Sequence, residues 1–169
     1  PVKELTTLQT APFLFVDSQF LTICQERNFS GVLYVDFIPF ETARLRLRPQ
    51  EAKDAGFALC IWGDPITGKY LTDPALDTID NLNEYMELLR HLNDSADCYY
   101  VIAEDKVTGQ AIGTCCAVIK ENGRCWDIGY CIHPTCWRKG YAKEMVGALV
   151  DFGIQNGVKT FLADVAADN

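Results

Sequence analysis

Residues 131–145 read CIHPTCWRKGYAKEM, and this stretch decides the fold. An apolar run stops at Pro134, a short basic loop follows, and a helical pattern begins after Gly140. A strand pattern that changes to a helix pattern across a polar loop predicts a strand–loop–helix unit. Arg138 and Lys139 stand directly before the helix, where the positive end of the helix dipole disfavours cations. Their position slightly favours a loop that serves an anion.

The loop 137–142 has the chemistry of a phosphate or pyrophosphate cradle. A helix start leaves about four N–H groups without intrahelical partners, and the helix dipole adds positive potential to them. Gly140 has no Cβ and lets the backbone come close to a ligand. An ordinary strand-to-helix connection, with a turn at Gly140 and a solvated basic pair, explains the same residues about as well. The local sequence leaves both interpretations open.

The whole chain has the size and composition of one soluble globular domain, with 169 residues, 49% of them hydrophobic and 22% charged. A formal net charge of -8 argues against nucleic-acid binding, which normally needs a basic face, and suits a cationic partner better. The sequence contains neither a run of 18 apolar residues nor a signal-peptide pattern. We therefore expect a cytoplasmic protein with no membrane partner.

The cysteines do not predict a metal site. Eight are present, at positions 24, 60, 98, 115, 116, 125, 131 and 136, with no C-x-x-C pair and only two histidines in the chain. Several lie in apolar runs, where a thiol behaves as a small hydrophobe, so we expect free buried thiols in a reducing compartment. A nucleophilic cysteine would need a base, and His133 is the one histidine close to them in sequence.

The order of elements predicts an α+β domain with a mixed, mostly antiparallel sheet flanked by helices. Asn122-Gly123 is a strong hairpin signal between two of the strands. The helix after the loop carries an apolar stripe and ends at Asn156-Gly157. The expected strands are 43–49, 98–104, 110–121, 124–133 and 159–166, and the expected helices are 50–62, 80–93 and 140–155. The last strand follows a β-loop-α-β crossover, which must be right-handed and parallel.

The segment IHPTCWRKGYAKE, residues 132–144, resembles the acetyl-CoA-binding loop of the GNAT superfamily of N-acetyltransferases, Arg/Gln-x-x-Gly-x-Gly/Ala. Trp137 takes the first position in place of Arg/Gln, Gly140 the fourth and Ala142 the sixth. Glu144 and the segments ETARLRLRP, TGQAIGTC and DIGYCIHP narrow the likeness to the ribosomal-protein N-terminal (alanine and serine) acetyltransferases.

The resemblance implies a three-layer α/β GNAT fold over 41–169 and a set of coenzyme contacts. The backbone of Tyr130 and Ile132 would pair with the pantetheine arm, and Asn169 would approach the coenzyme. The N–H groups of Arg138, Lys139, Gly140, Tyr141 and Ala142 would hold the pyrophosphate. Trp137, at the first position of the loop, completes the set of coenzyme-binding residues. Acetyl-CoA is then the cosubstrate, and no metal is needed.

In such enzymes the acceptor amine attacks the thioester directly, so the protein supplies positioning and a route for the amine proton. Asp127 is the best-placed carboxylate for a general base, because it shares one strand face with Gly129 and Cys131. A surface carboxylate on a half-exposed strand is the other interpretation of Asp127. His133 and Glu104 are weaker candidates, and a water relay remains open.

Family members normally continue past the Asp-Asn at 168–169 with a further helix and strands. We therefore expect a GNAT domain at 41–169 that lacks this C-terminal part, preceded by a β-rich extension at 1–40. The chain is then a fragment, or a partner supplies the missing part, or residues 1–40 fill the gap. In the last case the strand 31–39 should pair beside the last strand.

Two functions follow from the resemblance. The first is an N-acetyltransferase that transfers the acetyl group of acetyl-CoA to a primary amine on a peptide or small molecule, for instance a protein N-terminus. The second is an inactive CoA-binding sensor or interaction module. Both functions are compatible with a monomer or a homodimer.

Overall fold

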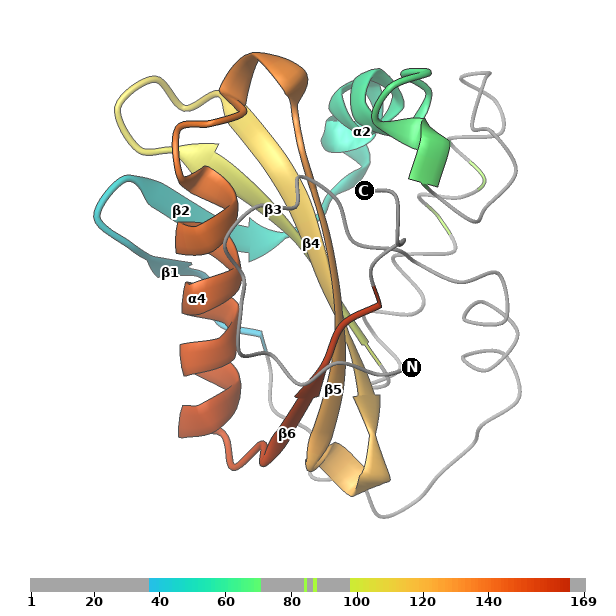
Figure 1. The fold of residues 1–169 in the computed structure, drawn as a ribbon. Helices are drawn as coiled ribbons and strands as arrows, with labels where there is room; N and C mark the ends of the chain where they lie inside the picture. The colour runs from blue at the N-terminus through green and yellow to red at the C-terminus, as the bar shows by residue number, and fades with distance from the viewer. Residues whose placement is uncertain (1–36, 71–83, 85–86, 88–97, 165–169) are drawn as a thin grey trace.

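The computed structural model describes residues 37–70, 84, 87 and 98–164 (Figure 1). Residues 1–36, which form most of the predicted β-rich extension, lie outside this part, as does Asn169. Of the predicted helix 80–93, only Glu84 and Glu87 are described, and both are helical.

The described residues form a six-stranded sheet in which the spatial order of the strands follows the sequence. The strands are β1 (Phe40–Glu41), β2 (Leu45–Pro49), β3 (Cys98–Asp105), β4 (Ala111–Lys120), β5 (Cys125–Ile132) and β6 (Thr160–Leu162). Neighbours from β1 to β5 are antiparallel, and β6 pairs parallel to β5. The predicted mixed sheet with one parallel joint is confirmed.

The part of the N-terminal extension that is described reaches the sheet at the edge away from β6. Phe40 pairs with Leu47 of β2, so β1 and β6 are the two outer strands of this sheet. Whether residues 31–36 lie near β6 falls outside the described residues.

Two helices lie on opposite faces of the sheet (Figure 1). Helix α2 (Ala55–Trp62) follows a 3-10 turn, η1 (Ala52–Asp54), so the predicted helix 50–62 begins later than expected. A side-chain oxygen of Asp54 accepts a hydrogen bond from the Glu51 N–H, which stabilises this tight turn before the α-helix. Helix α4 (Tyr141–Gln155) connects β5 to β6, as predicted.

The main hydrophobic core lies between the sheet and α4. The predicted helical stripe supplies Met145, Val146 and Leu149, which are at most 2% exposed. They pack against alternate residues of the strands, which point to the same face of the sheet, including Leu45, Leu47, Tyr99, Val101, Trp126, Ile128, Tyr130 and Ile132. This packing fixes α4 against β5, and with it the position of the connecting loop.

The opposite face of β2 differs from the prediction at one residue. Alternation with Leu45 and Leu47 predicts an exposed arginine at 48, but Arg48 is only 6% exposed. Its guanidinium forms two hydrogen bonds of 2.7 Å with Asp54 and lies 2.6 Å from Glu104. A buried arginine needs such partners, and here they tie β2 to β3 and to the start of α2.

Two further expectations concern the hairpin and the cysteines. Three residues of the β4–β5 turn have positive φ, namely Glu121 (52°), Asn122 (55°) and Gly123 (89°), so the predicted hairpin is confirmed. All seven cysteines in the described part are free thiols, and five of them are buried. Burial raises the pKa of the Cys131 thiol to about 12. No helix among the described residues is long and apolar enough to cross a lipid bilayer.

Candidate functional site

The loop between β5 and α4 begins with a short turn and ends in left-handed backbone. His133 precedes the 3-10 helix η4 (Pro134–Cys136), and its ring nitrogen lies 2.8 Å from the hydroxyl of Thr135. Arg138 then has φ 61° and Gly140 φ 78°. Positive φ is uncommon for a residue with a Cβ, so the Arg138 conformation depends on contacts that hold the loop.

Gly140 is the N-cap of α4, and within the described residues no side chain caps this helix. The first N–H groups of the helix therefore have neither an intrahelical partner nor a cap. Left-handed backbone followed by right-handed helix turns successive N–H groups toward one concave site, which suits an anion. The 15 residues of α4 align their peptide dipoles toward the same point.

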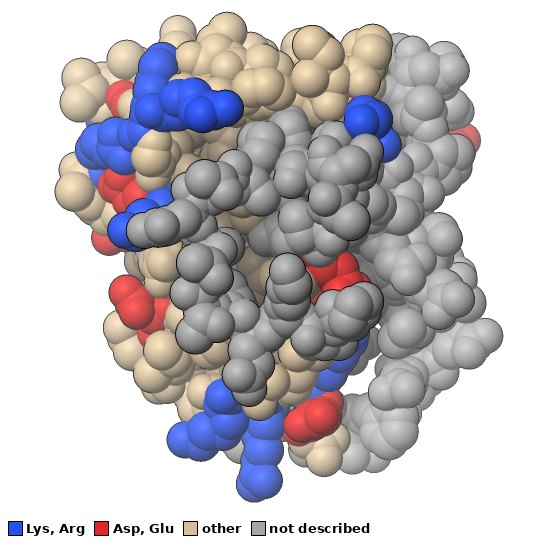
Figure 2. Space-filling view, viewed as in Figure 1, with Lys and Arg blue, Asp and Glu red and all other residues tan. Residues whose placement is uncertain are grey.

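Basic side chains surround this helix start. Figure 2 shows Lys and Arg side chains gathered over the β5–α4 loop and the beginning of α4, at the upper left of the view. Arg138, Lys139 and Lys143 are all exposed. The Lys139 ammonium donates a 2.8 Å hydrogen bond to the Thr135 carbonyl, so it also closes the loop on itself. The basic pair Arg138 and Lys139 thus lies at the start of α4, and Lys139 has a structural contact.

Trp137, which stands in the family's Arg/Gln position, packs toward the protein interior. Its indole Nε1 donates a 2.7 Å hydrogen bond to the Ile132 carbonyl. The ring contacts both the main core and the small cluster of Ile61 and Cys131 beneath α2. Trp137 therefore anchors the loop to the end of β5.

At Tyr130 and Ile132, the residues predicted to hold pantetheine, the backbone N–H and C=O groups of β5 point to the side away from β4. His133 N–H bonds to Ile112 O on β4, and hydrogen-bonded pairs alternate along an antiparallel ladder. The N–H and C=O groups of Tyr130 and Ile132 consequently face away from β4. Within the described residues β6 pairs with β5 only over Cys125–Asp127, so β5 extends beyond that pairing toward the loop.

Glu144, in the first turn of α4, connects the helix start to the turn between β1 and β2. One carboxylate oxygen accepts hydrogen bonds from the Thr42 hydroxyl (2.5 Å) and the Arg44 backbone N–H (2.8 Å), and the other from Arg44 Nε (2.6 Å). Burial acts to raise the pKa of Glu144, but these hydrogen bonds outweigh it and lower the pKa. We call this set of contacts between Glu144, Thr42 and Arg44 the Glu144 clip.

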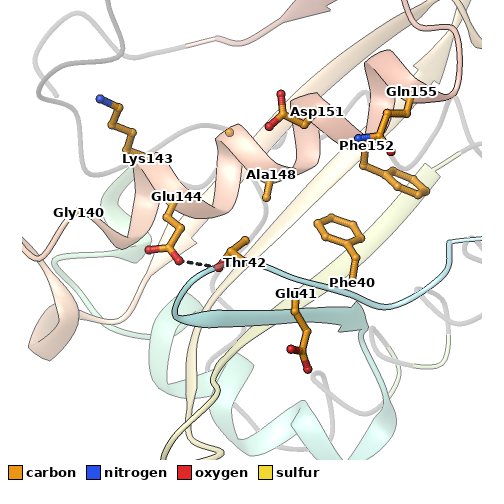
Figure 3. A pocket seen from close by; sticks show the side chains of 11 residues that line it. Phe40, Glu41, Thr42, Gly140, Lys143, Glu144, Ala148, Asp151, Phe152 and Gln155 are labelled. Atoms are coloured by element: carbon orange, nitrogen blue, oxygen red, sulfur yellow. Dashed lines mark hydrogen bonds between the residues drawn. The ribbon is translucent and has the colours of Figure 1, made fainter.

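The Glu144 clip lies at one end of a groove of about 680 Å³ between β1 and α4 (Figure 3). Gly140 and Lys143 line the same end, and Phe40 and Phe152 line the other. The two phenyl rings stack with their centroids 5.2 Å apart.

Arg44 is the residue that sequence reasoning missed, because the strand pattern assigns it only an exposed position. Its Nη1 donates a 2.9 Å hydrogen bond to the Lys139 carbonyl, and its guanidinium carbon lies 4.3 Å from the centre of the Tyr141 ring. These partners lie 95–100 positions away in sequence, so no local signal could have identified them.

The base candidates lie on strands near the sheet centre and at the loop. Asp127 pairs with Lys120 of β4 at 2.7 Å, and its side chain is 26% exposed. Glu104 accepts hydrogen bonds from buried Arg48, and the His133 ring stacks on Phe57 at 6.0 Å. In the part of the chain that the structure describes, Asp127 is also the last residue of β5 that pairs with β6. Among the described side chains, no three His, Cys, Asp or Glu converge as a metal site would require.

A sequence profile of the acetyltransferase (GNAT) domain matches residues 44–169, three quarters of the chain. The chain belongs to the GNAT family. The match includes all of the β5–α4 loop, and the mixed sheet with its helices agrees with the fold that the resemblance implied.

A sequence relative supports this membership. The uncharacterized N-acetyltransferase p20 of Bacillus licheniformis is 32% identical over 116 residues, which cover 66% of this chain and 64% of p20. The chain thus spans slightly less than two thirds of the length of this relative.

Solved structures share the fold at lower identity. The ribosomal-protein-S5-alanine acetyltransferase from Vibrio fischeri superposes with a TM-score of 0.58 at 17% identity, over 71% of this chain and 69% of that one. A spermidine N-acetyltransferase from Vibrio cholerae, solved in complex with CoA and spermine, also gives 0.58, at 21% identity over 66% and 64%.

Proposed function

We propose that this GNAT-family protein is an acetyl-CoA-dependent N-acetyltransferase that acts on a primary amine. One observation carries the proposal: the uncapped start of α4, with left-handed Gly140, lies at the carboxyl end of β5 where β5 extends beyond its pairing with β6. Such a helix start suits the pyrophosphate of CoA. An extended pantetheine arm would lie along the neighbouring strand, where the Ile132 N–H faces away from β4 and the Ile132 carbonyl is already bonded to Trp137.

We assign the coenzyme contacts along this path. The N–H groups of Arg138 through Ala142 hold the pyrophosphate, with Trp137 anchoring the loop through Ile132. The backbone of Tyr130 and Ile132 faces the pantetheine arm. Asn169 completes the predicted set from outside the described residues. The GNAT domain itself is assigned to 41–169, with residues 1–40 as an N-terminal extension.

Acetyl transfer by direct attack needs a base near the thioester. The amine nitrogen bonds to the carbonyl carbon, the carbon–sulfur bond breaks, CoA leaves as the thiol, and the amine loses a proton. Asp127 lies about 16 Å along β5 from Ile132, at roughly 3.3 Å per residue, and next to the point where β6 begins to pair. An arm extending from the loop along β5 leads toward this carboxylate, which we propose as the base.

Asp127→Asn tests this role, because asparagine keeps the shape of the side chain and removes the carboxylate. We expect kcat to fall by about 10²–10⁴-fold, the usual contribution of general base catalysis, while CoA affinity stays unchanged. Steady-state kinetics and calorimetry measure the two quantities. Lys120→Met is the matched variant that removes the partner of Asp127 but not the carboxylate. An unchanged kcat in Asp127→Asn would exclude Asp127 as the base and leave His133, Glu104 or a water relay to take the proton.

The acceptor that we propose is a protein N-terminal amine in the cytoplasm. A net charge of -8 favours encounter with cationic amines generally, so polyamines form the competing class. The decisive experiment offers N-terminal peptides, polyamines and aminoglycosides to the protein with acetyl-CoA and records free thiol. Turnover with N-terminal peptides supports the proposal. Turnover with polyamines alone would identify a polyamine, and not a protein N-terminus, as the acceptor. CoA binding without thiol release in any arm would instead identify an inactive CoA-binding module.

A further inference from the structure

Arg44 contacts the β5–α4 loop from the turn between β1 and β2. Its backbone N–H and Nε bond to Glu144, and its Nη1 bonds to the Lys139 carbonyl at 2.9 Å. Its guanidinium also covers the face of Tyr141. A Cβ added to Gly140 would lie 3.6 Å from Arg44 Nη2. One side chain therefore contacts Lys139 and Tyr141 at the start of the helix and lies beside Gly140 between them.

The bond to Lys139 O fixes the orientation of a peptide that the proposed cradle needs. The C=O of Lys139 and the N–H of Gly140 belong to one peptide plane, and every described peptide bond is trans. In a trans peptide these two groups point in opposite directions. Arg44 holds the carbonyl on its own side of the loop, so the Gly140 N–H points to the other side.

Arg44 also offsets a charge that opposes anion binding. Glu144 carries a carboxylate in the first turn of α4, one turn from Gly140, where it would repel a bound phosphate. The guanidinium of Arg44 lies 2.6 Å from that carboxylate and neutralises it. The same residue therefore sets the direction of the N–H and limits the local negative charge.

We propose that Arg44 is a positioning residue for the pyrophosphate part of the coenzyme, acting through the Lys139–Gly140 peptide. This inference rests on the proposed CoA site. The guanidinium of Arg44 places Nε against Glu144 and Nη1 against Lys139 O at once, whereas a lysine has a single nitrogen for both positions. The role therefore depends on the geometry of the guanidinium as well as on its charge.

The test measures binding of CoA, inorganic pyrophosphate and pantetheine to the chain by NMR titration, which follows millimolar as well as tighter affinities. Arg44→Ala and Arg44→Lys are compared with Arg46→Ala, which removes an exposed positive charge two residues further along the chain, in β2. We expect both Arg44 variants to lose about tenfold or more in affinity for CoA and pyrophosphate, the worth of one charge-assisted hydrogen bond. Pantetheine binding and the Arg46→Ala variant should stay within about twofold of wild type.

The Gly140 amide resonance in the ligand-free protein provides a second measurement. It should move in Arg44→Lys, because the peptide is released, and stay in place in Arg46→Ala. Wild-type CoA affinity in Arg44→Lys would overturn the inference, as would an equal loss for pantetheine, which would indicate general damage to the fold. If Arg44→Ala does not fold, the Arg44→Lys comparison decides alone. Absence of CoA binding in the wild type would refute the proposed function itself, and the inference with it.

Discussion

The two ends of β5 carry turns of the same backbone type that are held in different ways. At one end the β4–β5 hairpin has positive φ at Glu121, Asn122 and Gly123. At the other end the β5–α4 loop has positive φ at Arg138 and Gly140. The hairpin is fixed by its own residues and the adjoining ladder. The loop has local bonds from Trp137 and Lys139 and, in addition, a bond from Arg44, 95 positions away from Lys139. We infer that the first turn serves folding and the second serves ligand binding.

Gly140→Val, in the β5–α4 loop, should have the largest effect on CoA affinity. A β-branched residue is strongly disfavoured at φ 78°, and its branches would meet the Arg44 guanidinium, 3.6 Å from the Cβ position. Displacing the loop removes two or more charge-assisted contacts, so CoA affinity should fall about 100-fold. Calorimetric titration with CoA measures it.

Gly123→Val is the control for Gly140→Val, because Gly123 has φ 89° in the hairpin. It should lower the free energy of unfolding by about 1–2 kcal/mol and leave CoA affinity unchanged. If both variants bind CoA like the wild type, the cradle does not exist.

Glu144→Gln should show how much the Glu144 clip contributes to the free energy of unfolding. Because the pKa of Glu144 is lowered in the folded state, its contribution is fully present above the ordinary value of 4.5 and is lost as pH falls through the lowered value. At pH 7 the variant should be less stable by about 1 kcal/mol, from weakened hydrogen bonds to a charged group. Urea unfolding at pH 7 and near pH 3 should show this difference shrinking in acid. A difference that does not depend on pH would contradict the assignment to the ionised carboxylate.

Asn122→Ala should have the smallest effect and act on stability alone. Asparagine tolerates the left-handed region better than alanine, so the free energy of unfolding should fall by about 0.5–1 kcal/mol. Gly147→Ala is a useful counterpart, because its Cβ would meet nothing within 4 Å on α4 and should raise stability by up to about 1 kcal/mol. Thermal unfolding measures both. A change in CoA affinity for Asn122→Ala would remove the functional distinction between the two turns.

The same contrast explains what could be predicted from the sequence. Periodicity and the Asn122-Gly123 signal predicted the strands β2 to β5, the hairpin, α4 and the parallel joint, because each depends on neighbouring residues or on the burial of one face. The β5–α4 loop was identified by its glycine and its basic pair. The buried state of Arg48 was not predicted, since Glu104 lies on another strand, 56 positions away, and Asp54 reaches Arg48 only because the chain turns at η1. Arg44 was missed for the same reason.

The most direct test of the central claim is an amide-resolved NMR titration of the wild-type chain with CoA. The account predicts that the amide resonances of Gly140, Tyr141 and Ala142 shift with the binding curve, while those of Glu121, Asn122 and Gly123 do not. Saturable CoA binding that leaves the Gly140–Ala142 amides in place would contradict it.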